Sequence, residues 1–180
     1  MAHTTASARQ ANLLGTLSLT VTGRVEAAVA ACSPYGPSAP AALSALEGYL
    51  GGEPIDALAR VLALTHSGAV RLVDRLAEAG LVERRRGADG RTVAVTLTRA
   101  GHRAAMEVRE ARERALADAL SVLDGGERQA LTVLTEKLLA GLTSDRASAR
   151  RICRLCDPDA CGHERGTCPV TRAASAPAGP

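Results

Sequence analysis

Four of the five cysteines lie within the last 28 residues of the 180-residue chain. Cys153, Cys156, Cys161 and Cys168 follow the spacing Cys-x2-Cys-x4-Cys-x6-Cys, and His163 lies inside the last interval. Thiolates and imidazoles are ligands for zinc and for iron–sulfur centres, and the binding energy of such a centre can order a segment that is too short to have a core. The pattern therefore predicts a metal or cluster site with these four cysteines as ligands.

The spacing leaves the identity of this centre open between zinc and an iron–sulfur cluster. A structural zinc site usually has two closely spaced pairs of ligands, whereas this sequence has one Cys-x2-Cys pair and two widely spaced cysteines, although His163 could replace one thiolate. An iron–sulfur cluster tolerates uneven spacing, and Cys168-Pro169 resembles the end of ferredoxin-type runs. A reversible disulfide switch is the third alternative, and it is disfavoured in a cytoplasmic protein.

Arginines are the second group of residues whose type and placement indicate a function. The net charge is only +3, but all except one of the 22 basic residues are arginine, and residues 55–103 contain nine of them against five acidic residues. Positive potential is therefore concentrated where a phosphate backbone could meet it. Phe and Trp are absent and only two tyrosines occur, which argues against stacking of single-stranded bases on aromatic rings. Duplex nucleic acid is the expected partner.

The middle of the chain supplies the elements that would position these arginines. A short helix begins at Pro54, and Thr65 caps a second helix, which ends at Gly80 in a left-handed conformation. Two strands, 81–86 and 91–98, follow and are joined by a Gly-Ala-Asp-Gly turn. The order of helix, turn, helix and hairpin predicts a winged helix-turn-helix.

Helices are expected on both sides of this segment. Apolar residues recur at helical spacing from about residue 9 to 31, 40 to 50, 99 to 123 and 131 to 142. Striped helices at both ends of a compact segment favour packing against a second copy of the chain, with packing inside one chain as the alternative. The predicted fold is mainly α with a small β wing, in which the winged helix-turn-helix is flanked by N- and C-terminal dimerisation helices.

Three regions are expected along the chain. Residues 1–145 form the winged helix-turn-helix with its dimerisation helices, 146–170 form the cysteine-rich segment, and 171–180, which are rich in Ala, Pro and Ser, form a disordered tail. Cys32 is expected to be a small buried apolar residue rather than a sensor. No stretch approaches the ~18 apolar residues of a membrane span and the start lacks the regions of a signal peptide, so we expect a cytoplasmic protein.

The middle segment resembles the MarR regulators of bacterial drug, phenolic and oxidative-stress responses. Four runs that are specific in order and spacing carry the resemblance: IDALA at 55–59, GAVRLVDRL at 68–76, AGLVER at 79–84, and DGR at 89–91 followed by VTLTRAG at 95–101. With the flanking helices, the resemblance covers about residues 9 to 143. One departure is Gly68, which replaces the hydroxyl residue usual at that position in the family.

The resemblance implies a homodimer that binds a palindromic operator in duplex DNA. Each subunit would place a recognition helix in the major groove and a wing in the minor groove. By analogy, the residues facing base edges would be His66, Ser67, Val70 and Arg71, and those meeting phosphates would be Arg75, Arg84, Arg85 and Arg86. Arg91 would enter the minor groove, with its guanidinium held by Asp89 through a charge-assisted hydrogen bond.

The expected function is sequence-specific regulation of transcription, as a repressor. DNA affinity would respond to a small aromatic or phenolic ligand or to the metal or redox centre at the C-terminal cysteines. The alternative is a winged-helix module that binds other proteins without specific DNA binding, and the arginine-rich hairpin speaks against it. No enzyme is expected, because the sequence contains no His-Glu-x-x-His helix, no Gly-x-Ser-x-Gly elbow and no dinucleotide-binding glycine turn.

Overall fold

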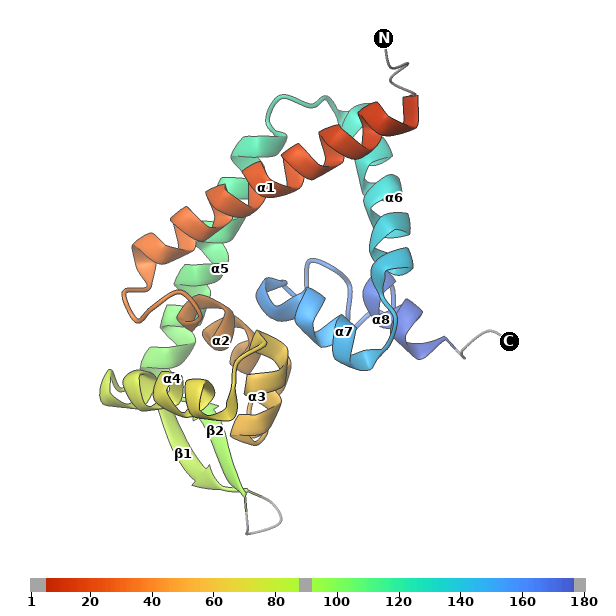
Figure 1. Cartoon of the computed structure of the whole chain (residues 1–180). Coiled ribbons are helices and arrows are strands. Elements are labelled where there is room, and N and C mark those ends of the chain that lie inside the picture. Colours follow the sequence, from red (N-terminus) through yellow and green to blue (C-terminus); the bar gives the residue numbers. More distant parts are fainter. Residues whose placement is uncertain (1–5, 88–91, 177–180) are drawn as a thin grey trace.

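The computed structural model describes residues 6–87 and 92–176, and these residues are mainly helical (Figure 1). The predicted fold class, mainly α with a small β wing, is confirmed. The helices are α1 (Ala6–Cys32), α2 (Ala39–Ala45), α3 (Ile55–Leu62), α4 (His66–Glu78), α5 (Arg99–Leu120), α6 (Gly125–Leu142), α7 (Arg146–Ile152) and α8 (Pro169–Ser175), with a π-helical turn η1 (Leu46–Leu50) and a 3-10 turn η2 (Cys153–Leu155). Strands β1 (Val82–Arg86) and β2 (Val93–Leu97) form an antiparallel hairpin.

Local capping determines the boundaries of the helix-turn-helix. Pro54 is extended and precedes α3, which ends because Ala63 adopts a left-handed conformation with a φ of 52°. The Thr65 side chain accepts a hydrogen bond from the Gly68 backbone N–H at 3.1 Å and so caps α4. Gly80 follows α4 with a φ of 70°, as the sequence predicts.

The hairpin has a third extended segment beside it, which sequence reasoning missed. The Gly52 N–H donates to the Val95 carbonyl at 3.0 Å, the Val95 N–H donates to the Glu53 carbonyl at 3.2 Å, and Pro54 forms an isolated bridge with Ala94. The residues just before α3 are therefore hydrogen-bonded to β2. This pairing fixes the hairpin relative to the first helix of the helix-turn-helix.

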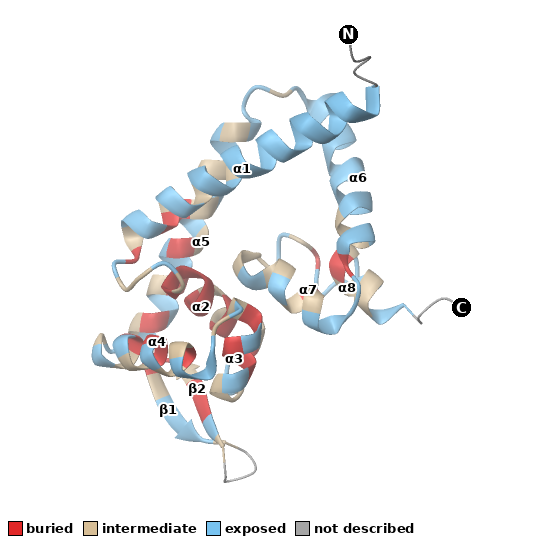
Figure 2. Ribbon diagram, viewed as in Figure 1, coloured by how far each residue is buried: buried red, intermediate tan, exposed pale blue. Residues whose placement is uncertain are grey.

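One apolar core holds α2, α3, α4 and the hairpin together. Its fully buried side chains come from each of these elements, and Figure 2 shows buried residues concentrated there. The largest are Leu43, Leu50, Leu58, Leu72, Leu76, Val73 and Val95. Complete burial of each such side chain contributes about 1.5–3 kcal/mol, so this cluster is the main source of stability for the winged helix.

The hairpin joins α5 through a close backbone contact at Gly101. The Thr98 hydroxyl caps α5 by accepting from the Gly101 N–H at 3.1 Å and donates to the Gly80 carbonyl at 2.6 Å. A Cβ atom at Gly101 would lie 1.9 Å from the Leu81 carbonyl oxygen. Only glycine fits at this position, which accounts for the glycine in the Thr-Arg-Ala-Gly sequence that begins α5.

The long helices α1 and α6 bury little of their surface. Helix α1 lies along α5 (Figure 1), and Val29 is its one fully buried residue. Helix α6 has no buried residue, although it carries five large apolar side chains that are exposed. No helix among residues 6–87 and 92–176 is long and apolar enough to cross a membrane.

The C-terminal region differs from the expectation of disorder beyond residue 170. Residues through Ser175 form α8, which begins after Cys168 with Pro169 in its first turn. Val170 is 3% exposed and lies in a small apolar cluster with Ala149 and Cys168, against which Leu139 of α6 packs. These long-range contacts stabilise α8, so the predicted disordered tail is wrong for 171–175.

Candidate nucleic-acid interface and cysteine site

The face of α4 opposite the core carries the residues that the sequence assigns to base contacts. Ala69, Leu72, Val73 and Leu76 are buried, which turns the other side of the helix to solvent. His66, Ser67, Arg71 and Arg75 are exposed, whereas Val70 is half-buried. The predicted polar contacts therefore share one accessible surface, and Val70 lies at its edge.

Hydrogen bonds orient the first turn of this surface. His66 Nδ1 lies 2.6 Å from Asp56 Oδ1 of α3, and both side chains are exposed. The Ser67 hydroxyl lies 3.2 Å from the Thr65 hydroxyl. The imidazole is thereby tied to the first helix through Nδ1, which leaves its Nε2 for contact with a partner.

Arg71 and Arg75 differ in what surrounds them. Arg71 is exposed and takes part in no ion pair within the part of the chain that the structure describes. The Arg75 guanidinium lies over the loop between α1 and α2. A Cβ atom added at Gly36 in this loop would lie 3.4 Å from Arg75 Nη2. Arg71 is therefore available to an incoming partner, while Arg75 rests against the protein.

Arg84 and Arg85 of the hairpin are paired with carboxylates that sequence reasoning did not consider. Arg84 Nη2 lies 2.6 Å from Asp74 Oδ1 of α4, and Arg85 Nη2 lies 2.5 Å from Glu83 Oε1. The Arg84 pair connects the hairpin to α4, and both pairs offset positive charge locally. The signal for them was present in the sequence, since Asp74 lies on the outward face of α4 and Glu83 directly precedes the arginine run.

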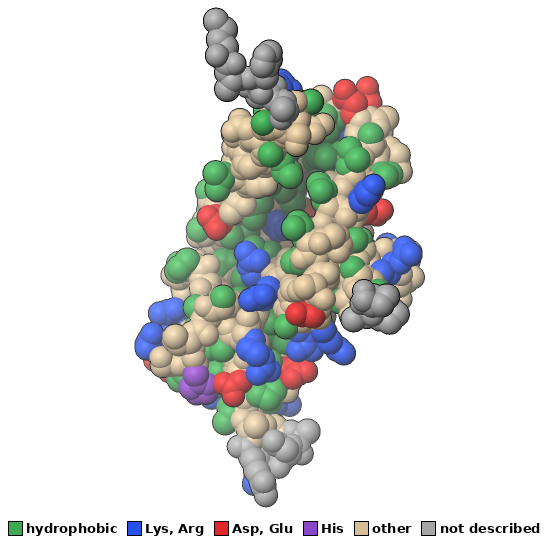
Figure 3. Space-filling view, turned by 45° about the vertical axis from the view of Figure 1, so that its right-hand side comes forward, with side chains coloured by type: hydrophobic (Ala, Val, Ile, Leu, Met, Phe, Trp, Pro, Cys, Tyr) green, Lys and Arg blue, Asp and Glu red, His purple; other side chains and the backbone are tan. Residues whose placement is uncertain are grey.

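The remaining predicted DNA contacts are Arg86, Asp89 and Arg91. Arg86 is exposed at the end of β1. Asp89 and Arg91 lie outside the described residues. Figure 3 shows Lys and Arg side chains gathered across the middle and lower part of one face, while hydrophobic side chains are prominent in its upper part.

The four C-terminal cysteines, which are far from this surface in the sequence, come together around one cavity. They are free thiols, and all four line a cavity of about 530 Å³ together with Tyr49 and other residues of η1, α7 and α8. The thiols lie close enough to perturb one another's pKa values. The structure therefore brings the four predicted ligands together.

The thiol pKa values reflect this mutual contact. The hydrogen bond from Cys156 lowers the pKa of Cys153 below its usual value, and the same bond, followed by burial, raises the pKa of Cys156. Burial, followed by the charge of Cys156, raises the pKa of Cys161 to about 12. Burial opposes ionisation of Cys168, but hydrogen bonds from Thr171 outweigh it and lower the pKa of this thiol. Two of the four thiols therefore have lowered pKa values and two have raised ones.

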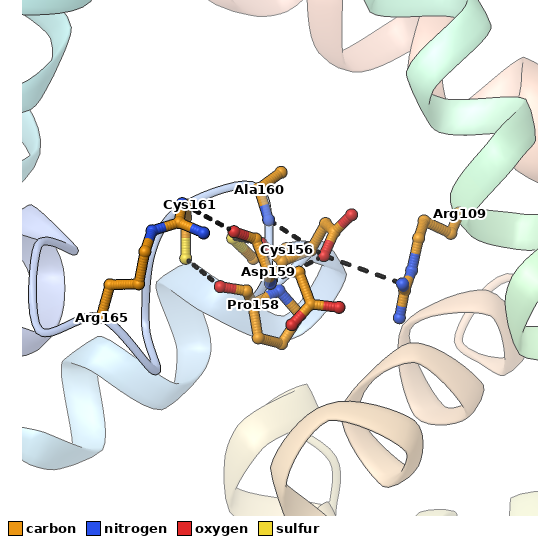
Figure 4. A network of polar contacts seen from close by, with 8 residues as sticks. Arg109, Cys156, Pro158, Asp159, Ala160, Cys161 and Arg165 are labelled. Carbon is orange, nitrogen blue, oxygen red and sulfur yellow. Dashed lines mark hydrogen bonds and ion pairs between the residues drawn. The ribbon is translucent and has the colours of Figure 1, made fainter.

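A compact turn fixes the positions of Cys156 and Cys161 (Figure 4). The Asp157 carboxylate accepts backbone N–H bonds from Asp159 at 2.9 Å and Ala160 at 3.3 Å, and the Cys161 N–H donates to the Asp157 carbonyl at 3.1 Å. The Cys161 thiol donates to the Pro158 carbonyl at 3.4 Å. The turn is therefore held by its own backbone rather than by an apolar core.

Three polar contacts attach the cysteine segment to the winged helix. The Tyr49 hydroxyl of η1 donates to the Arg150 carbonyl of α7 at 2.6 Å, and burial raises the pKa of Tyr49. Arg109 Nη1 of α5 lies 3.7 Å from Asp157 Oδ1, and Arg150 Nη2 lies 3.9 Å from Glu53 Oε1. Sequence reasoning missed this attachment, because the contacts join residues that are about 50 to 100 positions apart.

The ligand geometry differs from that of a site for one ion. Within residues 6–87 and 92–176, no three His, Cys, Asp or Glu side chains are grouped so that they could hold a single metal ion. His163, the alternative ligand, is exposed, and its Nδ1 lies 2.9 Å from the Thr171 hydroxyl.

Arginines of α7 also line a second cavity. Arg146, Arg150 and Arg151 line a cavity of about 430 Å³ together with Arg60 of α3. The four arginines make this region rich in positive charge. Cys32 is remote from both cavities at the end of α1, where it is partly buried, donates to the Val29 carbonyl at 3.3 Å, and has its pKa raised by burial.

Comparison with known proteins relates these elements to one family. Residues 37–92, from the loop before α2 to the residue before β2, match the model of the MarR family. No curated protein gave a significant match. A MarR family protein from Bacillus stearothermophilus is 29% identical, with a TM-score of 0.63, and the match covers 73% of this chain and 91% of that one.

Two further solved structures show how far the similarity extends. A MarR family protein from Mycobacterium tuberculosis, solved in complex with salicylic acid, is 27% identical with a TM-score of 0.50, covering 69% of this chain and 95% of that one. MepR, a transcription regulator of the Staphylococcus aureus multidrug efflux pump MepA, shares the fold with a TM-score of 0.64 at 17% identity, covering 74% of this chain and 98% of that one. Each match spans nearly all of the relative and leaves at least a quarter of this chain without a counterpart.

Proposed function

We propose that this chain is a MarR-type transcription regulator that binds duplex DNA as a homodimer and acts as a repressor. The observation that carries the proposal is the exposed polar face of α4 beside an arginine-bearing hairpin, within a segment that matches the MarR family model. An α-helix fits the major groove, where side chains can read base edges, and a basic hairpin next to it can reach the backbone and the minor groove.

The contacts divide into those that select a sequence and those that position the protein. Arg71, with His66 and Ser67 one turn before it, is placed to meet base edges. Arg75 and Arg86 would meet phosphates, and the hairpin tip with Asp89 and Arg91 would enter the minor groove. Arg84 and Arg85 would have to exchange Asp74 and Glu83 for phosphate oxygens.

The second copy of the chain would cover the apolar surfaces of α1 and α6. Leu134 is 60% exposed and Leu142 is 71% exposed on α6, and Leu17 and Leu19 are exposed on α1. A helix of 18 residues without a buried residue gains little stability from packing within its own chain, and a partner would supply the rest. Burial of these side chains between two copies supplies that packing and sets the distance between the two recognition helices.

The signal that controls DNA affinity is a separate part of the proposal. A small aromatic acid is one candidate, because a relative was solved with salicylic acid. The cysteine site is the other, since it contacts the winged helix directly. A ligand of either kind would act by binding the DNA-competent and DNA-incompetent arrangements with different affinity.

The proposal is tested by selecting from a pool of randomised duplexes with the purified chain. We expect enrichment of a palindromic sequence, and titration of that duplex should show two chains bound per site. Binding that falls steeply with salt and favours no sequence would support the winged-helix interaction module instead. Light scattering of the free protein should give a mass of two chains.

A further inference from the structure

We infer that the four C-terminal thiols hold an iron–sulfur cluster, and that the cluster fixes the cysteine segment against the winged helix. The site is formed by Cys153, Cys156, Cys161 and Cys168, which come from three separate turns of the segment and line one cavity. Nothing in the winged-helix function requires them. The assignment of the cluster is independent of the proposed function, whereas its effect on DNA rests on that function.

The first argument is that the segment lacks a sufficient core. Its apolar cluster contains three buried residues, Ala149, Cys168 and Val170, and one of them is a proposed ligand. Between Cys156 and Cys168 the chain is held by turns, and a Cβ at Gly162 would lie 2.0 Å from the Thr167 hydroxyl, so the loop is tightly folded there. A metal centre supplies the binding energy that such a short segment otherwise lacks.

The second argument distinguishes a cluster from a single zinc ion. A structural zinc site usually takes two closely spaced pairs of ligands. These four cysteines form one Cys-x2-Cys pair and two widely spaced single residues, and Cys168 is followed by Pro169, as at the end of ferredoxin-type runs. An iron–sulfur cluster binds its thiolates at separate iron atoms and accommodates this uneven spacing.

The third argument concerns charge. Four thiolates around a cluster leave a net negative charge, which is stable beside cations. The side chains of Arg146 and Arg150 line the same cavity. His163 also lines it, but its Nδ1 is engaged with the Thr171 hydroxyl, which favours four thiolates as the ligand set.

The segment touches both parts of the molecule whose relative position matters for DNA binding. Helix α7 and the turn after it contact η1 and α5 through Tyr49 and Arg109, and α8 packs on α6. Binding of the cluster would therefore fix the winged helix relative to the dimerisation helix. Loss of the cluster would release that constraint and change the spacing of the two recognition helices.

The cluster is tested by purifying the full chain without oxygen and measuring iron, acid-labile sulfide, zinc and the visible spectrum. We expect iron and sulfide in comparable amounts and broad visible absorption. If the protein as isolated holds no metal, it is incubated with ferrous iron and sulfide under reducing, anaerobic conditions and measured again. Stoichiometric zinc without sulfide overturns the inference, and so does a protein that remains free of metal after this incubation.

Variants define the ligand set. Cys156→Ser and Cys161→Ser should each lose iron and sulfide, whereas Cys32→Ser, on α1, should retain them. His163→Ala should also retain them, and loss of the cluster in this variant would contradict a site of four thiolates. Because the metal content of the unaltered chain is measured first, the inference can fail even if a ligand variant does not fold.

The effect on DNA is measured by comparing cluster-loaded and cluster-free protein on the selected duplex. A difference of about 5- to 150-fold in affinity is expected if the cluster couples to the recognition helices. Equal affinities of the cluster-loaded and cluster-free forms for the duplex would overturn the coupling between the cluster and DNA binding. The iron and sulfide content would still decide whether the four thiols hold a cluster. Absence of DNA binding in both forms overturns the proposed function and leaves the assignment of the cluster unaffected.

Discussion

At the scale of single residues, the recognition surface combines free and neutralised cations. Arg71 faces solvent from α4, whereas Arg84 is held by Asp74 on the same helix. An exposed ion pair contributes ~0–1 kcal/mol to stability, so the pair with Asp74 is more important for orienting the hairpin than for stabilising the fold. Its effect is to remove one positive charge from the surface that DNA would meet.

Replacement of Arg71 by alanine should weaken binding to the selected duplex by about 1–3 kcal/mol and reduce discrimination between sequences. The reason is that a guanidinium at this position can donate two hydrogen bonds to one base. Fluorescence anisotropy with selected and randomised duplexes measures both effects. Arg114→Ala on α5 is the matched control, because that arginine is exposed and remote from α4. Unchanged discrimination in Arg71→Ala would contradict its assignment to base edges.

Replacement of Asp74 by alanine should strengthen binding to every duplex and steepen its dependence on salt. The substitution removes a negative charge from α4 and releases Arg84 for a phosphate contact. Titrations at several salt concentrations give the slope, which should rise by about one unit. A weaker affinity at all salt concentrations would instead indicate that the hairpin orientation set by this pair is essential for binding.

At the scale of elements, local signals predicted the helix-turn-helix well. Pro54, Thr65 and Gly80 determine where α3 begins, where α4 begins and where it ends, and each acts through neighbours within a few residues. The pairing of Gly52 with β2 and the helix α8 were not predicted. Both depend on partners that are distant in sequence, such as Val95 and Leu139, and periodicity carries no information about them.

Replacement of Gly101 by alanine should destabilise the winged helix by more than about 2 kcal/mol, because the new Cβ would overlap with the Leu81 carbonyl and the backbone would have to shift. Gly141→Ala on α6 is the matched control. A Cβ added at Gly141 would meet no atom within 4 Å, and alanine in a helix is favoured by about 0.5–1 kcal/mol over glycine. Urea unfolding followed by circular dichroism measures both, and equal stability of the two variants would contradict the close contact.

Replacement of Tyr49 by phenylalanine should loosen the cysteine segment without unfolding the rest of the chain. The substitution leaves the Arg150 carbonyl without its donor, at a cost of about 0.5–1.5 kcal/mol, and keeps the aromatic ring in place. Hydrogen exchange should become faster in residues 146–176 and stay the same in α3 and α4. If residues 146–176 exchange at the same rate in the variant as in the unaltered chain, this hydrogen bond does not hold the segment.

At the scale of the whole molecule, the chain consists of a winged helix, two long helices that bury little, and a cysteine segment that touches both. The resemblance in sequence predicted the first two parts, because the runs from residue 55 to 101 are specific. The four cysteines could be identified from spacing, but their attachment to η1 and α5 could not. That attachment depends on how the chain folds back after α6.

Replacement of both Leu134 and Leu138 by glutamate should convert the proposed dimer to a monomer. The two side chains are 60% and 49% exposed on α6, and burial of charges between two copies is unfavourable without compensating partners. Light scattering and circular dichroism together separate dissociation from unfolding. A double variant that stays dimeric would place the interface elsewhere.

We propose that this molecule recognises a DNA sequence through α4 and its hairpin as a dimer. Titration of the purified chain against the selected palindrome and against randomised duplex of equal length, at the same salt concentration, tests this proposal. We predict two chains per palindrome and an affinity at least ~10³-fold above that for randomised duplex. Equal affinity for both duplexes would contradict the claim.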